Sequence, residues 1–265
     1  MNESNEIFLC DTVAISHLEH TYHHYNENIL KEFSQHQPLF LTETIINEMK
    51  MEEDTEKRYE TFLSQFPVVV GISEEDFPSI LSRAFQPSQH AFSKFRQSAI
   101  TTFQTIQSLS SSLEIKQSTG ALLSEYHSFF NEKRNKGEYS LLWLSLIISF
   151  INPTANINFL GVDRDLFSII HHCYFTHKSL VEQLRKARTN IEIMSIDTLL
   201  YGKTIKDSLS EDELKELCDY YRNPRRKTLF KDKKQGITSQ HVKDESLDNN
   251  HFASAIKNNH IDIIY

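Results

Sequence analysis

Five short apolar runs occur along the chain, and they lack the strict alternation of a half-exposed strand. Runs of this kind are typical of strands buried on both faces of a sheet. The expected strands are residues 7–10, 39–41, 67–72, 157–162 and 191–195. The β-branched triplet Val68–Val70 strengthens the prediction for the third of them.

Between these runs, apolar residues recur every three or four positions, which predicts helices. The expected helices cover 13–34, a segment holding Ile45 and Met49, a polar stretch up to 64, 85–135, 138–151 and a segment from 164 to 188. Strands that alternate with helices favour a parallel sheet with helices on both faces. The predicted fold class is therefore α/β, with three α/β/α layers around a central parallel sheet.

The last part of the chain has a different pattern. Ser210-Glu211-Asp212-Glu213 is a capping-box sequence and predicts a short helix. Residues 222–234 follow with seven basic residues and one acid, in a chain whose net charge is −8. We therefore expect residues 202–265 to form a helical and basic extension to a main domain at 1–201.

The longest apolar run, Leu141–Ile151, is much shorter than the roughly 20 residues that a membrane-spanning helix needs. We expect it to be a buried helix. The first residues carry no basic segment followed by an apolar one, and the three cysteines form no CxxC pair. These features predict a cytoplasmic protein without disulfides.

Acidic residues recur at matching points of the strand and helix pattern. Asp11 and Asp163 each follow a predicted strand, Glu48 lies in the helix after the second strand, and Glu138 opens the apolar helix. Ligands of open parallel sheets bind at the carboxyl ends of the strands, so these acids should meet at one edge. Carboxylates gathered there repel one another unless a cation compensates them, and oxygen ligands select Mg²⁺ or Mn²⁺.

The segments around these acids resemble the motifs of the PIN-domain nuclease family. The family's opening motif is similar to the segment FLCDTVAIS of this chain, and its second motif is similar to LFLTETIINEM. Its Gly-Glu motif is similar to KGEYSLLWLSL, and its last motif is similar to NFLGVDRDLF. VVVGISEED and IEIMSIDTLL fall where the family has its third and fifth strands. The resemblance covers about 6–201.

The resemblance implies metal-dependent cleavage of RNA, with Asp11, Glu48, Glu138 and Asp163 as catalytic metal ligands and Asp165 as an auxiliary ligand. Thr12 would hold the first loop through its hydroxyl group. A toxin or defence effector is the biological role that the family suggests, with RNA as substrate and an inhibitor or other protein, or a second copy of the chain, as further partners. No membrane partner is expected.

The chain differs from the family pattern at three points. Val13 stands where an Asn commonly follows the Asp-Thr pair, and Gly161-Val162 replaces a Thr-Asn pair before the last aspartate. The interval between Glu48 and Glu138 is long, which predicts an inserted helical segment at about 86–135. Such an insertion would serve as a lid or as a partner surface.

The basic stretch 222–234 has two interpretations. It would bind RNA phosphates, since it supplies positive charge that the rest of the chain lacks, or it would be a solvated tail that contacts nothing. The candidate phosphate ligands are Arg225, Arg226, Lys227, Lys233 and Lys234.

Two other functions compete with a ribonuclease. One is a catalytically inactive PIN-like module that binds RNA or a protein partner, an alternative that the altered neighbours of Asp11 and Asp163 favour. The other takes VDRDLF as the nucleophile loop of a haloacid-dehalogenase-like phosphatase, with Asp163 attacking phosphate. That loop normally opens its domain, and the later motifs of that family have no clear match here.

Overall fold

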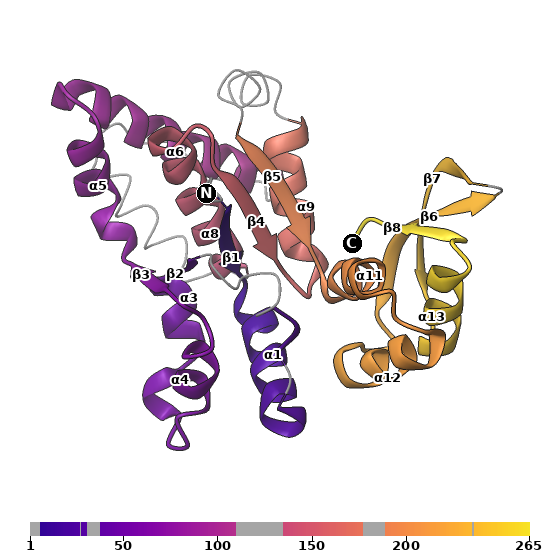
Figure 1. Cartoon of the computed structure of the whole chain (residues 1–265). Coiled ribbons are helices and arrows are strands. Elements are labelled where there is room, and N and C mark those ends of the chain that lie inside the picture. The colour runs from indigo at the N-terminus through magenta and orange to yellow at the C-terminus, as the bar shows by residue number, and fades with distance from the viewer. Residues whose placement is uncertain (1–5, 27, 31–37, 110–134, 177–188, 235) are drawn as a thin grey trace. The chain divides into compact units, whose positions relative to one another are not determined.

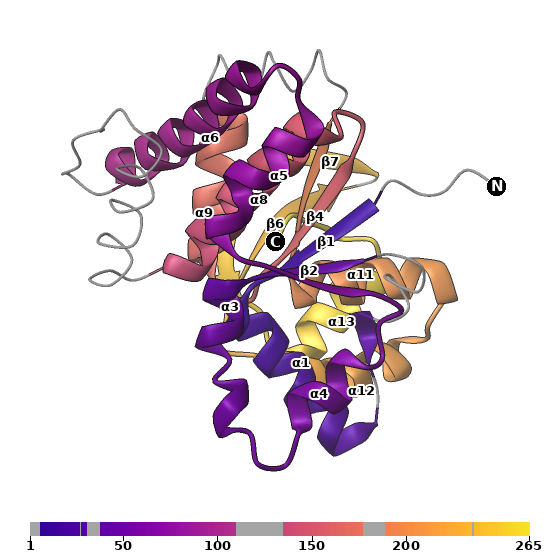
Figure 2. The same cartoon turned by 90° about the vertical axis from the view of Figure 1, so that its left-hand side faces the viewer.

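The computed structural model describes residues 6–26, 28–30, 38–109, 135–176, 189–234 and 236–265. The chain forms two compact units (Figure 1, Figure 2). The first consists of Met1–Ile15 and Ser34–Glu192, and the second of Ser16–Phe33 and Ile193–Tyr265. The predicted domain limit at 201/202 falls within one helix, α11 (Ile196–Asp207), which packs on other elements of the second unit.

The first unit is built on a five-stranded, all-parallel sheet, as the sequence predicted. Its strands are β1 (Glu6–Cys10), β2 (Leu39–Thr42), β3 (Val69–Ile72), β4 (Asn156–Leu160) and β5 (Asn190–Met194). Their order is β3-β2-β1-β4-β5, so β1 lies in the middle, where Leu9 and Cys10 are fully buried. This mixed α/β architecture is compatible with three layers.

The apolar helix is α8 (Lys136–Ile151), and it packs against β1 and β2. It is buried on nearly all sides, which confirms the prediction of a core helix rather than a membrane span. Helices α5 (Phe77–Ala84), α6 (Ser88–Leu109) and α9 (Arg164–His171) pack on α8. No described helix is long and apolar enough to cross a membrane.

The described part of the predicted insertion belongs to this core. Phe95 and Phe103 on α6 lie against Trp143 of α8, with ring centroids 5.6 and 6.2 Å from the indole. The Trp143 Nε1–H group donates a buried hydrogen bond of 2.9 Å to Ser98 Oγ. Residues 88–105 therefore act as a packing layer of the first unit, while 110–134 lie outside the described residues.

The predicted helices differ from the observed ones mainly where the backbone turns into the left-handed region. Helix α1 (Thr12–Tyr25) stops before Asn26, which has φ 55°. The polar stretch after α3 (Glu43–Glu48) is divided into η1 (Met51–Glu53) and α4 (Arg58–Leu63), because Lys50 and Lys57 have φ 51° and 54°. The helix after Asp163 is α9 followed by a π-helical turn, η3 (His172–Thr176), and its predicted end at 177–188 lies outside the described residues. A short η2 (Glu74–Asp76) precedes α5.

The second unit contains an antiparallel sheet that the sequence did not predict. Its strands β6 (Lys227–Lys234), β7 (Ile237–Ser246) and β8 (Ile261–Ile263) are arranged in the order β7-β6-β8. Helices α12 (Glu211–Tyr221) and α13 (Asn249–Lys257) pack on each other. The capping box at Ser210 and Glu213 is present, which confirms the predicted start of α12.

Arg222 holds this second unit together. Its guanidinium group is almost fully buried, bonds to Asp197 Oδ1 at 2.9 Å and to Thr228 Oγ1 at 2.9 Å, and lies 4.3 Å from the ring centroid of Phe252. It also donates to the Leu247 carbonyl oxygen. One side chain thereby joins α11, β6 and α13 to the end of α12.

Candidate functional site

Asp11 lies at the carboxyl end of the central strand. Its N–H group donates to the Leu160 carbonyl oxygen at 2.9 Å, which fixes it beside the end of β4, and its own carbonyl oxygen accepts the first helical bond of α1 from Ile15 at 3.0 Å. The residue is 2% exposed, and among the described residues its Oδ2 atom has no hydrogen-bond partner. A buried carboxylate oxygen without a partner is rare and energetically unfavourable.

The surroundings of Asp11 disfavour its charge. Burial raises the pKa of the Asp11 carboxyl to about 6, the backbone N–H groups of Val13 and Thr12 oppose that rise, and repulsion by Asp163 and Glu48 adds to it. The acids at the ends of β1 and β4 and on α3 therefore lie near one another.

Glu48 is the last residue of α3, and two features fix its carboxylate. Thr12 Oγ1 donates a hydrogen bond of 2.7 Å to Glu48 Oε2, so the hydroxyl group that we expected to hold the first loop binds this acid. Gly137 approaches from α8, and a Cβ atom at that position would lie 2.7 Å from Glu48 Oε2 and 2.8 Å from Ile45 Cδ1. Any larger residue at this position would displace the ends of the Glu48 and Ile45 side chains.

Glu138 lies in the first turn of α8, next to that glycine. Burial raises the pKa of the Glu138 carboxyl to about 8, and repulsion by Asp11, Glu48 and Asp165 contributes in the same direction. Asp163 precedes α9 without capping it through its side chain. Strand β4 ends at Leu160, so Gly161 and Val162 form a short loop between the strand and this acid.

The structure thus places Glu48 and Asp163 close enough to Asp11 to raise its pKa, and Asp11, Glu48 and Asp165 close enough to Glu138 to raise the pKa of that carboxyl. Within the described residues, however, no three His, Cys, Asp or Glu side chains are grouped so that they would hold a metal ion as they stand. The bond from Thr12 to Glu48 and the repulsion between the carboxylates are physical reasons for this open arrangement.

Sequence reasoning missed one acid at the same edge of the sheet. Glu74 follows β3, is 3% exposed and accepts a hydrogen bond of 3.3 Å from the Thr44 N–H group. Its signal was its place shortly after a predicted strand. Glu74 binds the first turn of α3, the helix that carries Glu48.

The basic residues proposed for phosphate binding lie in or next to β6, in the second unit. Lys233 is ion-paired with Asp262, and Lys227 Nζ lies 3.9 Å from Asp244. Lys234 and Arg225 are exposed, and Arg226 is half-buried. The stretch 227–234 is therefore a paired strand rather than a tail that contacts nothing, and acids of β7 and β8 offset part of its charge.

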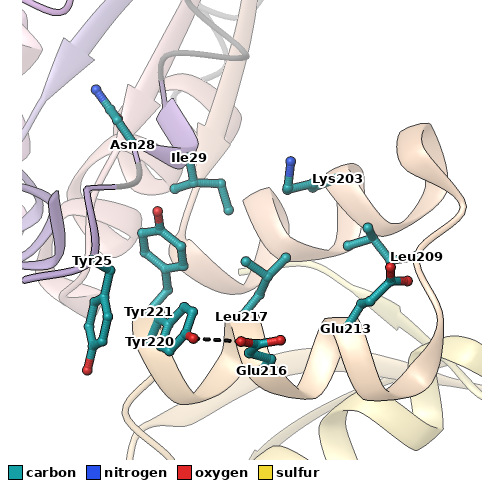
Figure 3. Close-up of a pocket in the computed structure, with 10 residues that line it drawn as sticks. All are labelled: Tyr25, Asn28, Ile29, Lys203, Leu209, Glu213, Glu216, Leu217, Tyr220 and Tyr221. Atoms are coloured by element: carbon teal, nitrogen blue, oxygen red, sulfur yellow. Dashed lines mark hydrogen bonds between the residues drawn. The ribbon is translucent and has the colours of Figure 1, made fainter.

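A pocket of about 470 Å³ also lies within the second unit (Figure 3). The rings of Tyr25 and Tyr220 stack at its rim with centroids 4.2 Å apart. The Tyr220 hydroxyl donates to Glu216 Oε1 at 2.7 Å, and Glu213 is engaged in the capping box of α12. The lining is mixed: Asn28, Lys203 and these two carboxylates lie beside its aromatic and apolar side chains. None of the predicted site residues lines it.

Comparisons with protein-family models, with curated proteins and with solved structures gave no match.

Proposed function

We propose that the chain is a PIN-like, divalent-metal-dependent ribonuclease whose site is the acidic edge of the parallel sheet. The observation that carries this proposal is the buried Asp11 carboxylate, whose Oδ2 has no partner among the described residues while other carboxylates repel it. A protein interior tolerates such a group when a cation binds there, because the cation supplies both the missing partner and the compensating charge.

The donor set fits a hard divalent cation. Asp11, Glu48, Glu138 and Asp163 would hold Mg²⁺ or Mn²⁺, with Asp165 as an auxiliary ligand, since each offers carboxylate oxygen and no thiolate or imidazole is involved. A metal ion bound there would supply an activated water and would offset the charge that develops on the phosphate.

The residues of the chain would prepare this site in different ways. Asp11 anchors it at the end of β1, where two backbone N–H groups orient the carboxylate. Thr12 and Gly137 define the position of Glu48, and Glu138 projects from the rigid, fully packed α8. Sites carried by packed strands and helices keep their geometry better than sites on loops.

A cleavage assay tests the proposal directly. The full chain should cleave RNA with Mg²⁺ or Mn²⁺ and lose that activity in EDTA, and Asp11→Asn should reduce the rate by at least about a hundredfold, as is typical when a group that stabilises the transition state is removed. Asp212→Asn is the matched control, because Asp212 is an exposed acid on α12. Undiminished cleavage by Asp11→Asn would rule out the assigned site.

A second candidate is a PIN-like module that binds RNA or a protein partner without cleaving. The open arrangement of the acids and the engagement of Glu48 by Thr12 favour it. Thermal unfolding with and without Mn²⁺ separates the two, because a ligand that binds only the folded state raises the midpoint. No rise in the midpoint at millimolar Mn²⁺ supports the inactive module.

A toxin or defence effector remains the role that we propose on the family resemblance alone. An inhibitor protein that covers the acidic edge would fit this role.

A further inference from the structure

Three aromatic rings lie one above another along helix α9 and the π-helical turn after it. The ring centroids of Phe167 and His171 are 5.4 Å apart with planes inclined by 23°, and those of His171 and Phe175 are 5.3 Å apart with planes inclined by 25°. The three residues are four positions apart, so they occupy one face of the helix. We call this set the aromatic stack.

The aromatic stack is not part of the core. Leu166, Ile169 and Ile170 form the buried face of α9, whereas His171 is exposed and Phe175 is 53% exposed. A large exposed phenylalanine stabilises the fold little, and aromatic rings on a protein surface often mark a binding site. The planes of neighbouring rings are nearly parallel, which is an arrangement that a further flat ring can extend.

The position of the stack relates it to the proposed active site. Asp163 directly precedes α9, so Phe167 is about one helical turn beyond that acid and Phe175 is roughly 18 Å along the helix from it. A nucleic-acid strand whose backbone passes Asp11 and Asp163 would carry its neighbouring bases along this face.

The charge of the protein also favours RNA binding through stacking on the bases over binding of the phosphates. The chain has a net charge of −8, and lysines of the basic strand β6 are paired with acids of β7 and β8. Phe230, the aromatic residue within the basic stretch, is buried at 3% exposure and offers no ring to a base. Base–aromatic stacking, in contrast, does not need a positively charged surface and accepts any base sequence.

We propose that the aromatic stack is a base-stacking platform that holds single-stranded RNA beside the acidic edge. This inference rests on the proposed nuclease function for its substrate, and it assigns the binding to the bases rather than to the phosphates. Duplex RNA would not use the platform, since its bases are already stacked on one another.

Binding measured without cleavage tests the platform. The full chain, as Asp11→Asn and in EDTA, is titrated with a labelled short single-stranded RNA in a filter-binding assay. Phe175→Ala should weaken binding about fivefold to a hundredfold, the range expected for the loss of one stacked base. Phe175→Trp should retain or improve binding, and Phe175→Leu, which keeps apolar bulk without a flat ring, should weaken it.

Phe92→Ala is the matched control, because Phe92 is a phenylalanine of similar exposure, 45%, on α6. It should leave the dissociation constant unchanged. Stacking also predicts a slope of log K against log salt shallower than about −2, since a single strand contributes about −0.7 for each phosphate that the protein neutralises.

Three results would overturn the platform. Phe175→Ala could bind as tightly as the parent protein, or it could lose no more affinity than Phe92→Ala. The chain could also bind duplex RNA more tightly than single-stranded RNA. A stack that covers only a protein partner would give no RNA binding at all, which also overturns it. The assay contains no metal, so a chain that binds through Phe175 yet never cleaves refutes the nuclease alone. A chain that cleaves RNA while ignoring Phe175 refutes the platform alone.

Discussion

Asp11 in the first unit and Arg222 in the second are both charged side chains that folding removes from water. Arg222 meets a carboxylate, a hydroxyl group, a carbonyl oxygen and an aromatic ring, so its charge and its donors are satisfied. Asp11 meets two backbone N–H groups on one side and other carboxylates around it, and its Oδ2 has no partner among the described residues.

The difference separates two uses of buried charge. A satisfied ion pair such as Arg222–Asp197 specifies how elements of a fold fit together. A group of like charges opposes folding and persists because the site serves a ligand, which is the usual situation at active sites. Four sets of variants test this difference between the two units.

The largest effect should come from removing the satisfied charge. Arg222→Ala leaves the largely buried Asp197 without its ion-pair partner and with only the Thr228 hydroxyl group bonded to it, and should lower the free energy of unfolding by about 3–5 kcal/mol. Urea denaturation followed by circular dichroism measures this. Lys57→Ala, which removes an exposed pair with Glu60, is the control and should change stability by less than about 0.5 kcal/mol. A small effect of Arg222→Ala would show that the stability of the second unit does not depend on the interactions of Arg222.

Burial of Glu138 and Asp11, together with repulsion between the acids, should make the metal-free protein less stable as pH rises. Folding raises the pKa of Glu138 from 4.5 to about 8 and that of Asp11 from 3.8 to about 6. The folded state therefore binds more protons than the unfolded state between those values, so the free energy of unfolding falls from about pH 4 to pH 8.

Glu138→Gln should remove much of that fall, on the order of 3 kcal/mol at pH 8, because the amide has no proton to lose and stays neutral at every pH of the experiment. Urea denaturation in EDTA at several pH values measures it, with Glu60→Gln as an exposed control. A wild-type stability that rises over this range would contradict the repulsion between the acids.

Gly137→Ala should have an intermediate effect. The added Cβ atom meets the ends of two side chains, Glu48 Oε2, which Thr12 holds, and the buried Ile45 Cδ1, so both side chains must shift and the protein should lose about 1–3 kcal/mol of stability. The greater helix propensity of alanine offsets part of the loss. In Gly71→Ala, the added atom would meet only the flexible end of Ile46 at 3.2 Å, and a smaller loss is expected. Equal stabilities of both variants would mean that Gly137 does not constrain Glu48.

The smallest effect should come from a surface pair of the second unit. Lys243 Nζ lies 2.8 Å from Asp232 Oδ2 across strands β6 and β7, but both side chains are partly exposed. Lys243→Ala should therefore lower stability only slightly, and added salt should reduce the difference further. A loss as large as that of Arg222→Ala would remove the distinction between buried and exposed pairs in this unit.

The sequence predicted the parallel sheet and its acidic edge because both depend on local patterns. Leu9 and Cys10 lead to Asp11 in a single apolar run, and Glu138 begins a continuous apolar helix. These signals are contained in a few consecutive residues. The contact of Gly137 with Glu48 joins residues that are far apart in the chain, so no local sequence pattern predicts it.

The antiparallel sheet escaped prediction for a related reason. Strand β6 contains only Leu229 and Phe230 as apolar residues, and its charges suggested a solvated segment. It is a strand because Lys227 and Lys231 have cross-strand partners in β7, which a single sequence does not reveal. The left-handed turns at Lys50 and Lys57 likewise carry no glycine or proline to mark them.

Trp143 gives the first unit a property that the second lacks. It is the chain's single tryptophan, fully buried among Phe77, Phe95 and Phe103. Indole emission depends on exposure to water. Fluorescence excited selectively at tryptophan therefore reports the unfolding of the parallel-sheet core and does not report the unfolding of the antiparallel sheet. Compared with a backbone signal from the whole chain, it reveals whether the two units unfold together or in sequence.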